Sequence, residues 1–102
     1  FIADRAYTVV RIDAIHSTAG TDAGAVTLQP RKSTGVQAPA SGVVLTTATH
    51  NLKGTVETVT NFTLTATTAD RDLAVGNRLS VDITGVTTAV AGVVVTVTLR
   101  RK

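Results

Sequence analysis

The stretch VVVTVTLR, residues 93–100, carries the clearest structural signal in the chain. Every second residue from Val93 to Leu99 is apolar, and threonine occupies most of the positions between them. Successive side chains of an extended strand point to opposite faces, so this alternation predicts a β-strand with one buried face. The stretch therefore indicates a sheet that packs against a core.

The composition of the whole chain agrees with this interpretation. Threonine and valine together supply 36 of the 102 residues, and both are β-branched residues that favour pleated sheets. Leucine is sparse, Glu57 is the only glutamate, and methionine, cysteine and tryptophan are absent. A helical protein draws on the straight-chain residues that are scarce here. Without cysteine, neither a disulfide nor a thiolate metal site can form.

Turn signals divide the rest of the chain into further strands. Gly- and Pro-containing segments separate runs of alternating or β-branched residues, and no strand–helix alternation occurs. Pro30 predicts a strand end or a sheet edge. The pattern predicts a single-domain jelly-roll-like β-sandwich of seven or eight antiparallel strands over residues 1–102. The expected strands cover residues 6–16, 25–32, 43–49, 61–67, 78–84 and 93–100, and residues 50–60 are expected to hold a turn and a short strand.

Alternation also predicts which side chains form the core, and the composition indicates how much stability that core can supply. The apolar residues are mostly valine and alanine, so the core is thin, and a domain of this size often gains stability from association. The first residue is Phe1, which indicates a processed, partial or truncated chain. The residues expected to point inward are Val10, Ile12, Val26, Leu28, Phe62, Leu64, Leu79, Val81, Ile83, Val95, Val97 and Leu99.

The stretch HSTAGTDAGAVT, residues 16–27, contains residue types found in catalytic loops and also in turns. Strand signals flank it on both sides, and Gly20 and Gly24 are suited to the positive φ of a tight reversal. A phosphate-binding loop would lead into a helix, whereas here a strand follows. We therefore interpret the stretch as a turn.

The two histidines, His16 and His50, are the remaining candidates for chemistry. With Asp22 or another acidic residue they are possible members of a metal or acid–base site. Their spacing matches no metal motif, and both lie beside turn signals, where exposed histidines are ordinary. The acidic residues at 70–72 are interpreted as a solvated corner rather than a calcium loop. We expect no catalytic, cofactor-binding or metal site, and no enzyme activity.

The net charge is +3, and the basic residues include the pair at 31–32 and the terminal run at 100–102. Solvation is the commoner role of such charges. Three aromatic residues offer no platform for stacking bases, so nucleic-acid binding is not expected. No apolar run has the length of a membrane-spanning helix, and no membrane partner is expected.

Three segments of the chain resemble small jelly-roll proteins of tailed bacteriophage virions. They span residues 9–45, 51–85 and 91–102, and they include a turn after the first strand and the corner LAVGNRL from Leu73 to Leu79. In this corner Asn77 occupies the polar position. The resemblance is to capsid decoration proteins, also called cement or head-fibre proteins, and it covers nearly the whole chain.

The resemblance implies a structural protein on the outer surface of the capsid in the virion. It implies a homotrimer that binds the major capsid protein and carries out no catalysis. It assigns no role to individual residues. The alternative is a receptor- or glycan-binding module of a phage fibre.

The N-terminal segment FIADRAY, residues 1–7, is the expected site of contact with the capsid or with another subunit. Phe1, Ile2 and Tyr7 would serve as apolar anchors, and Arg5 would supply a polar contact. The alternative is that these residues belong to the first strand of the sandwich.

Overall fold

The computed structural model describes all residues from 1 to 102. Strands account for most of the regular structure, and the helical content is one turn of α-helix and one turn of 3₁₀-helix. The all-β prediction is therefore confirmed. The elements are β1 (Tyr7–Ile15), β2 (Thr27–Ser33), the 3₁₀ turn η1 (Pro39–Ser41), β3 (Val43–Val44), β4 (His50–Asn51), β5 (Thr60–Asn61), α1 (Thr68–Arg71), β6 (Asp72–Leu73), β7 (Arg78–Thr84) and β8 (Val94–Arg101).

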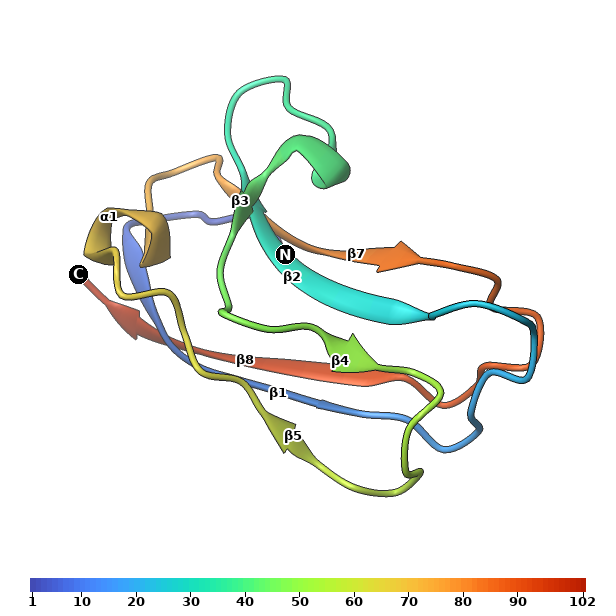
Figure 1. Cartoon of the computed structure of the whole chain (residues 1–102). Coiled ribbons are helices and arrows are strands. Elements are labelled where there is room, and N and C mark those ends of the chain that lie inside the picture. The colour runs from blue at the N-terminus through green and yellow to red at the C-terminus, as the bar shows by residue number, and fades with distance from the viewer.

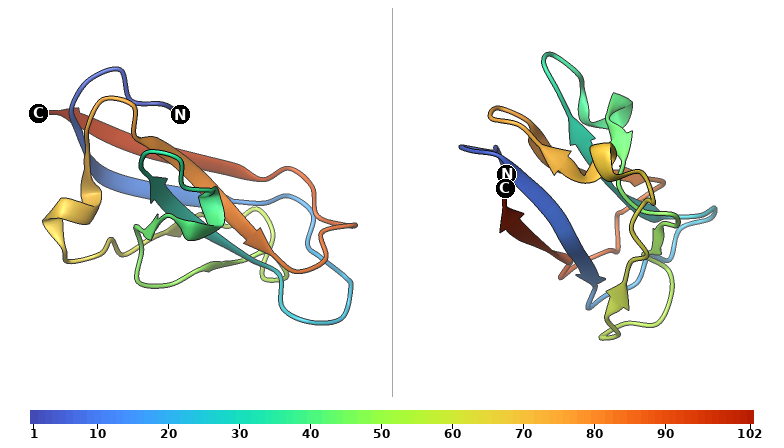
Figure 2. Two further views of the ribbon diagram at one scale, coloured as in Figure 1. Left: turned by 90° about the horizontal axis from the view of Figure 1, so that it is seen from above. Right: turned by 90° about the vertical axis from the view of Figure 1, so that its left-hand side faces the viewer.

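Two antiparallel sheets pack face to face (Figures 1 and 2). In one sheet β1 is central, with β8 along one edge and the short strands β5 and β6 along the other. In the second sheet β2 is central, with β7 along one edge and β3 and β4 along the other. The first strand thus pairs with the last and the second with the second-last, which is the nested wrapping of a jelly roll. The predicted sandwich is confirmed.

A β-bulge changes the inward face of β1. The register with β8 shifts between Val9 and Arg11, so Val10 is an extra residue in the ladder. An extra residue reverses the alternation from that point on. Val9 and Ile12 are therefore both fully buried, whereas Val10 is exposed. The prediction that Val10 points inward is wrong for this reason.

Pro30 lies in the middle of the central strand β2, and not at a strand end or an edge as predicted. Its carbonyl accepts a hydrogen bond from the Leu45 N–H (3.1 Å), so its nitrogen faces the same side of the strand. On that side β3 pairs with residues 31–32 and β4 with residues 27–28, which leaves Pro30 opposite the gap between them. A proline is tolerated there because no ladder bond needs its missing N–H.

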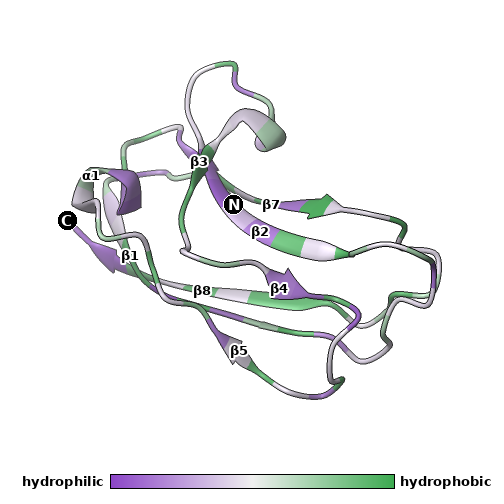
Figure 3. Cartoon of the chain, viewed as in Figure 1, coloured by the Kyte–Doolittle hydropathy of each residue, from purple (hydrophilic) through white to green (hydrophobic).

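The core consists of eleven buried apolar residues contributed by both sheets. Predicted inward positions such as Ile12 and Leu28 are fully buried. Val81 and Ile83 are not buried as expected, since they remain 39% and 42% exposed. Figure 3 shows the apolar colour along the middle of β8 and the polar colour at its C-terminal end. The core residues are Ala3, Val9, Ile12, Ala14, Val26, Leu28, Leu45, Leu52, Phe62, Leu73 and Leu79.

The side of the sandwich that carries β3, β4, β5 and β6 is closed by backbone hydrogen bonds between the sheets. The Thr47 N–H donates to the Thr63 carbonyl and the Thr65 N–H donates to the Leu45 carbonyl, both at 2.9 Å. The strands expected at 43–49 and 61–67 are consequently shorter than predicted, because residues 45–47 and 63–65, which lie between the paired strand segments, hydrogen-bond to each other across this side of the sandwich. We call this side the closed rim.

Candidate functional site

An apolar cleft opens between the two sheets on the side of β7 and β8. Its volume is about 470 Å³, within the size range of ligand-binding clefts. Seven of the nine lining residues are hydrophobic. The lining residues are Phe1, Pro30, Leu45, Leu79, Ser80, Val81, Val95, Val97 and Leu99.

Two strand edges without partners border this cleft. β7 is hydrogen-bonded only to β2, and β8 only to β1. Residues 1–3 cover the beginning of β7, where the Leu79 N–H donates to the Phe1 carbonyl and the Ala3 N–H donates to the Asn77 carbonyl, both at 2.9 Å. Residues 80–84 of β7 and the whole outer edge of β8 form no backbone hydrogen bonds there. We call these two free edges and the cleft between them the open rim.

The open rim is nearly free of charge. Between residues 79 and 99 the only ionisable side chain is that of Asp82. Its carboxylate accepts a hydrogen bond from the Arg31 Nε at 3.2 Å, so this charge is paired across β7 and β2. At the start of β7 the Arg78 guanidinium donates to the carbonyls of residues 35 and 37, in the loop after β2. Apart from the paired Asp82, charges that commonly guard an edge strand are therefore absent from the middle of the rim and lie only at its end, at Arg78, Arg100 and Arg101.

The predicted contact residues lie at one end of the open rim. Phe1 lines the cleft and is 59% exposed, and its ring meets the Tyr7 ring edge-on with centroids 5.9 Å apart. The Ile2 side chain is 67% exposed, and Arg5 is also exposed. We call Phe1, Ile2, Arg5 and Tyr7 the N-terminal patch. Its backbone is held in place by the hydrogen bonds of residues 1–3 to β7.

A hydrogen bond from Tyr7 fixes the chain beside this patch. The Tyr7 hydroxyl donates to the Asp4 carboxylate at 2.8 Å. This hydrogen bond lowers the pKa of Asp4 and raises the pKa of Tyr7, because it stabilises the carboxylate and the protonated phenol. The hydrogen bond joins the two ends of the turn at residues 4–7.

The two histidines are buried, which corrects the expectation that they are exposed beside turns. His16 is fully buried and His50 is 4% exposed. The His16 Nδ1 and the His50 Nε2 are 2.9 Å apart, within hydrogen-bonding distance. His16 continues the inward alternation of Ile12 and Ala14 at the end of β1, and this alternation is the signal that could have predicted its burial.

The hydrogen bonds around the histidines define one consistent arrangement of neutral tautomers. The His16 Nε2 lies 3.3 Å from the Gly54 carbonyl, which can only accept, so this nitrogen carries the proton. The His16 Nδ1 then accepts from the His50 Nε2–H. The remaining nitrogen, His50 Nδ1, accepts from the Thr60 hydroxyl at 2.8 Å. Burial lowers the pKa of His50, and the neighbouring His16 lowers it further.

This line of Thr60, His50 and His16 has the order of a nucleophile, a base and an orienting group. It lies on the closed rim, whereas the cleft of the molecule lies on the open rim and is lined by none of the three residues. The Glu57 N–H also donates to the His16 carbonyl at 2.9 Å. The contacts therefore fasten the loop between β4 and β5 onto the end of β1.

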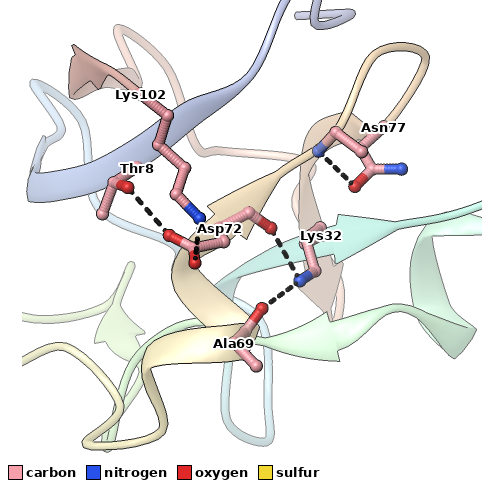
Figure 4. Close-up of polar contacts among 7 residues, drawn as sticks. Thr8, Lys32, Ala69, Asp72, Asn77 and Lys102 are labelled. Carbon is pink, nitrogen blue, oxygen red and sulfur yellow. Dashed lines mark hydrogen bonds and ion pairs between the residues drawn. The ribbon is translucent and has the colours of Figure 1, made fainter.

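Lys32 is a buried cation that joins the two sheets (Figure 4). It is only 7% exposed, and its ammonium donates to the carbonyls of Ala69 (2.8 Å) and Asp72 (3.0 Å). The Asp72 carboxylate accepts from Thr8 and from Lys102, both at 2.8 Å, and the hydrogen bond from Lys102 is the largest cause of its lowered pKa. The interpretation of the Lys32 charge as solvated is therefore wrong, whereas the partly exposed Asp72 carboxylate is paired with Lys102.

The stretch at residues 16–27 connects β1 in one sheet to β2 in the other, so it is a crossover and not a hairpin. Gly24 has the expected positive φ of 87°. Gly20 does not, and its lack of a side chain serves packing, since a Cβ would lie 3.2 Å from Lys53 Cγ. Asp22 contributes its carbonyl to the Lys53 ammonium at 2.6 Å and makes no hydrogen bond to either histidine.

The folded chain brings together no group of three or more histidine, cysteine, aspartate or glutamate residues suited to hold a metal ion. None of its helices has the length and apolar character needed to cross a membrane. No protein family, no curated protein and no solved structure matches the chain.

Proposed function

We propose that the chain is a structural virion protein that decorates or cements the outer surface of a phage capsid. In this proposal it binds the major capsid protein, associates with copies of itself as a homotrimer, and carries out no catalysis. The resemblance of its sequence segments to capsid decoration proteins suggests this role. The observation that supports it best is the exposed N-terminal patch on a backbone held by hydrogen bonds.

The physical argument concerns preorganisation. Phe1 and Ile2 expose most of their apolar side chains, although the Ala3 beside them is 2% exposed and anchored in the core. Burying apolar surface contributes about 25 cal/mol per Å², and a fixed backbone loses little entropy on docking. Arg5 adds a cation at the edge of the patch. Such a surface suits binding to a large rigid lattice of protein.

The test is binding of the purified chain to capsids of the phage that encodes it, prepared without it, by co-sedimentation. The double variant Phe1→Ser and Ile2→Ser removes the apolar anchors without touching buried residues. A matched control is Val59→Ser, because Val59 has a similar exposure of 60% but lies in the loop before β5. We expect the double variant to lose binding and the control to keep it.

Two outcomes would contradict the proposal. One is wild-type chain that does not sediment with the capsids at micromolar concentration. The other is full binding by the double variant. Binding to host cells instead of capsids would favour the receptor- or glycan-binding alternative, for which the exposed edge-on pair of Phe1 and Tyr7 is the available aromatic surface.

A further inference from the structure

We propose that a second copy of this chain covers the open rim. This inference deepens the self-association included in the proposed function and identifies the surface through which it occurs. It places backbone pairing at the free edges of β7 and β8, and apolar side chains of the neighbouring copy over the cleft. The N-terminal patch at the end of the rim remains available to a different partner.

The first argument is the state of the two edges. β8 extends over eight residues and has a partner on one side only, and β7 extends over seven residues and has a partner on one side only beyond Leu79. Long edge strands are normally protected by charges, prolines or bulges on the edge, because unpaired N–H and C=O groups recruit other strands. Neither strand contains a proline, and the bulge in the β1–β8 ladder lies in β1.

The chain itself shows that the edge of β7 accepts an extended apolar segment. Residues 1–3 lie along the turn before β7 and its first two residues through hydrogen bonds of 2.8–2.9 Å at Gly76, Asn77 and Leu79. The pairing at Ile2 and Arg78 is antiparallel. Residues 80–84 have no backbone hydrogen bonds on the same edge, so antiparallel pairing of this kind is open there to a strand of a neighbouring copy.

The second argument is the exposure of the inward-facing side chains. Val81 lines the cleft, yet it is 39% exposed, and Ile83 two residues further is 42% exposed. The corresponding face of β2 at Leu28 is fully buried. Val95 and Val97 on the opposite side of the cleft are only partly buried. This apolar row with a period of two residues matches the inward face of another β-strand.

The third argument is charge, and it distinguishes a second copy from an acidic partner. The chain carries a net charge of +3, but between residues 79 and 99 the rim contains only the paired Asp82, and the cations Arg100 and Arg101 lie at the end of β8. An acidic surface or a nucleic acid lying along the rim would be met by cations along its length, whereas Arg78 at the start of β7 is engaged with the loop carbonyls of residues 35 and 37. The uncharged middle parts of two rims can meet without like-charge repulsion, so the chain is complementary to itself along this surface.

The experiment measures the oligomeric state by sedimentation velocity over a range of micromolar concentrations. Val81→Lys places a cation in the rim, and Ile83→Lys serves as a second variant if the first does not fold. The matched control is Val44→Lys, since Val44 has nearly the same exposure, 37%, but lies in β3 on the closed rim. Circular dichroism verifies that each variant keeps the sheet structure.

We expect the wild type and Val44→Lys to associate, and we expect a rim variant to be monomeric, with its dissociation constant raised about 100-fold or more by burial of an unpaired charge. A monomeric wild type, or a rim variant that associates as well as the wild type, would overturn the inference. Equal dissociation of the Val44→Lys control would also overturn it, because the effect would then not be specific to the rim.

Capsid co-sedimentation of the same proteins separates this inference from the proposed function. Association that depends on the rim, without any capsid binding, would support the inference and contradict the proposed function. A monomeric wild type whose capsid binding is abolished by Val81→Lys would show that the lattice protein covers the rim. That result would overturn the assignment to a second copy and leave the capsid proposal supported.

Discussion

The two rims of the sandwich differ in whether backbone hydrogen bonds join the two sheets. On the closed rim, short strands and their connections carry backbone hydrogen bonds from sheet to sheet, such as Thr47 to Thr63. On the open rim, β7 and β8 are long and regular, and no hydrogen bond joins them. The segments that follow these short strands seal the sandwich because they hydrogen-bond to each other from one sheet to the other. Long, straight strands leave their edges and the cleft between them uncovered.

The polar residues follow the same division. The closed rim contains the buried histidine pair and, near β6, the buried ammonium of Lys32. The histidine rings and the Lys32 ammonium have partners within the chain, as burial requires, whereas the buried Arg71 Nε beside β6 has none. The open rim contains mostly valine and threonine. The closed rim therefore stabilises the monomer, while the open rim leaves strand edges and apolar side chains available to a partner.

The largest expected difference between the rims concerns apolar truncation. Leu52 on the closed rim is fully buried, so Leu52→Ala should reduce the free energy of unfolding by about 2–5 kcal/mol. Ile83 on the open rim is 42% exposed, and Ile83→Ala should cost less than about 1.5 kcal/mol when measured on the monomer. Urea denaturation below the concentration at which the chain associates measures both. Equal losses would mean that the rims do not differ in packing.

The next prediction compares two lysines that each donate to two backbone carbonyls. Lys32 is 7% exposed and binds Ala69 and Asp72, whereas Lys53 is exposed and binds Asp22 and Gly24. Lys32→Met should lower the free energy of unfolding by about 1.5–3 kcal/mol, because it leaves two poorly solvated carbonyls without their charged donor.

Lys53→Met is the matched control, and we expect it to cost less than about 1 kcal/mol because water replaces the lost donor. Thermal or urea unfolding of the two variants measures the difference. A larger loss for the Lys53 variant would contradict the role of Lys32 as a tie between the sheets.

The smallest predicted effect is a dependence of stability on pH through His50. Its pKa is lowered from 6.5 in the folded chain, so the unfolded chain binds a proton more readily. Stability should be complete above about pH 6.5 and should fall as the pH drops below that value toward the folded pKa, by at most about 1.4 kcal/mol per pH unit.

Urea denaturation between pH 5 and 8 (a range chosen about the ordinary histidine pKa) measures this slope. The variant His50→Gln should have a lower free energy of unfolding, and this free energy should depend less on pH in the same range. The carboxylates with lowered pKa, Asp4, Asp13 and Asp72, contribute stability that is lost only as the pH falls below about 3.8, so they do not produce the slope. An unchanged slope in the variant would exclude His50 as its source.

Much of the fold follows from local pattern. The boundaries predicted for the strand at 78–84 coincide with β7, and those at 93–100 differ from β8 by one residue at each end. Both strands alternate cleanly over seven or eight residues, and such a pattern persists whatever the chain packs against. The strands at 43–49 and 61–67 are shorter than predicted, because β-branched content alone does not reveal where a segment bonds across the rim instead of within its own sheet.

The sites were predicted less well than the strands. His16 and His50 are 34 positions apart in the chain, and no local sequence pattern indicates that they contact each other. Lys32 next to Arg31 has the pattern of a solvated basic pair, yet alternation along β2 directs the two side chains to opposite faces. The N-terminal patch was selected from its apolar residues, and its proposed contact with a capsid stays a prediction.

The sequence by itself determined the all-β class, the two long strands near residues 78–84 and 93–100, and the absence of charge between residues 79 and 99 except for Asp82. These are properties of composition and of period-two alternation, which act over a few neighbouring residues. Only the tertiary structure decided that a bulge at Val10 reverses the inward face of β1, that Pro30 sits opposite a gap between strands, and that one rim closes while the other stays open. Those features depend on which strands become neighbours, and that choice is made by packing between residues far apart in the chain.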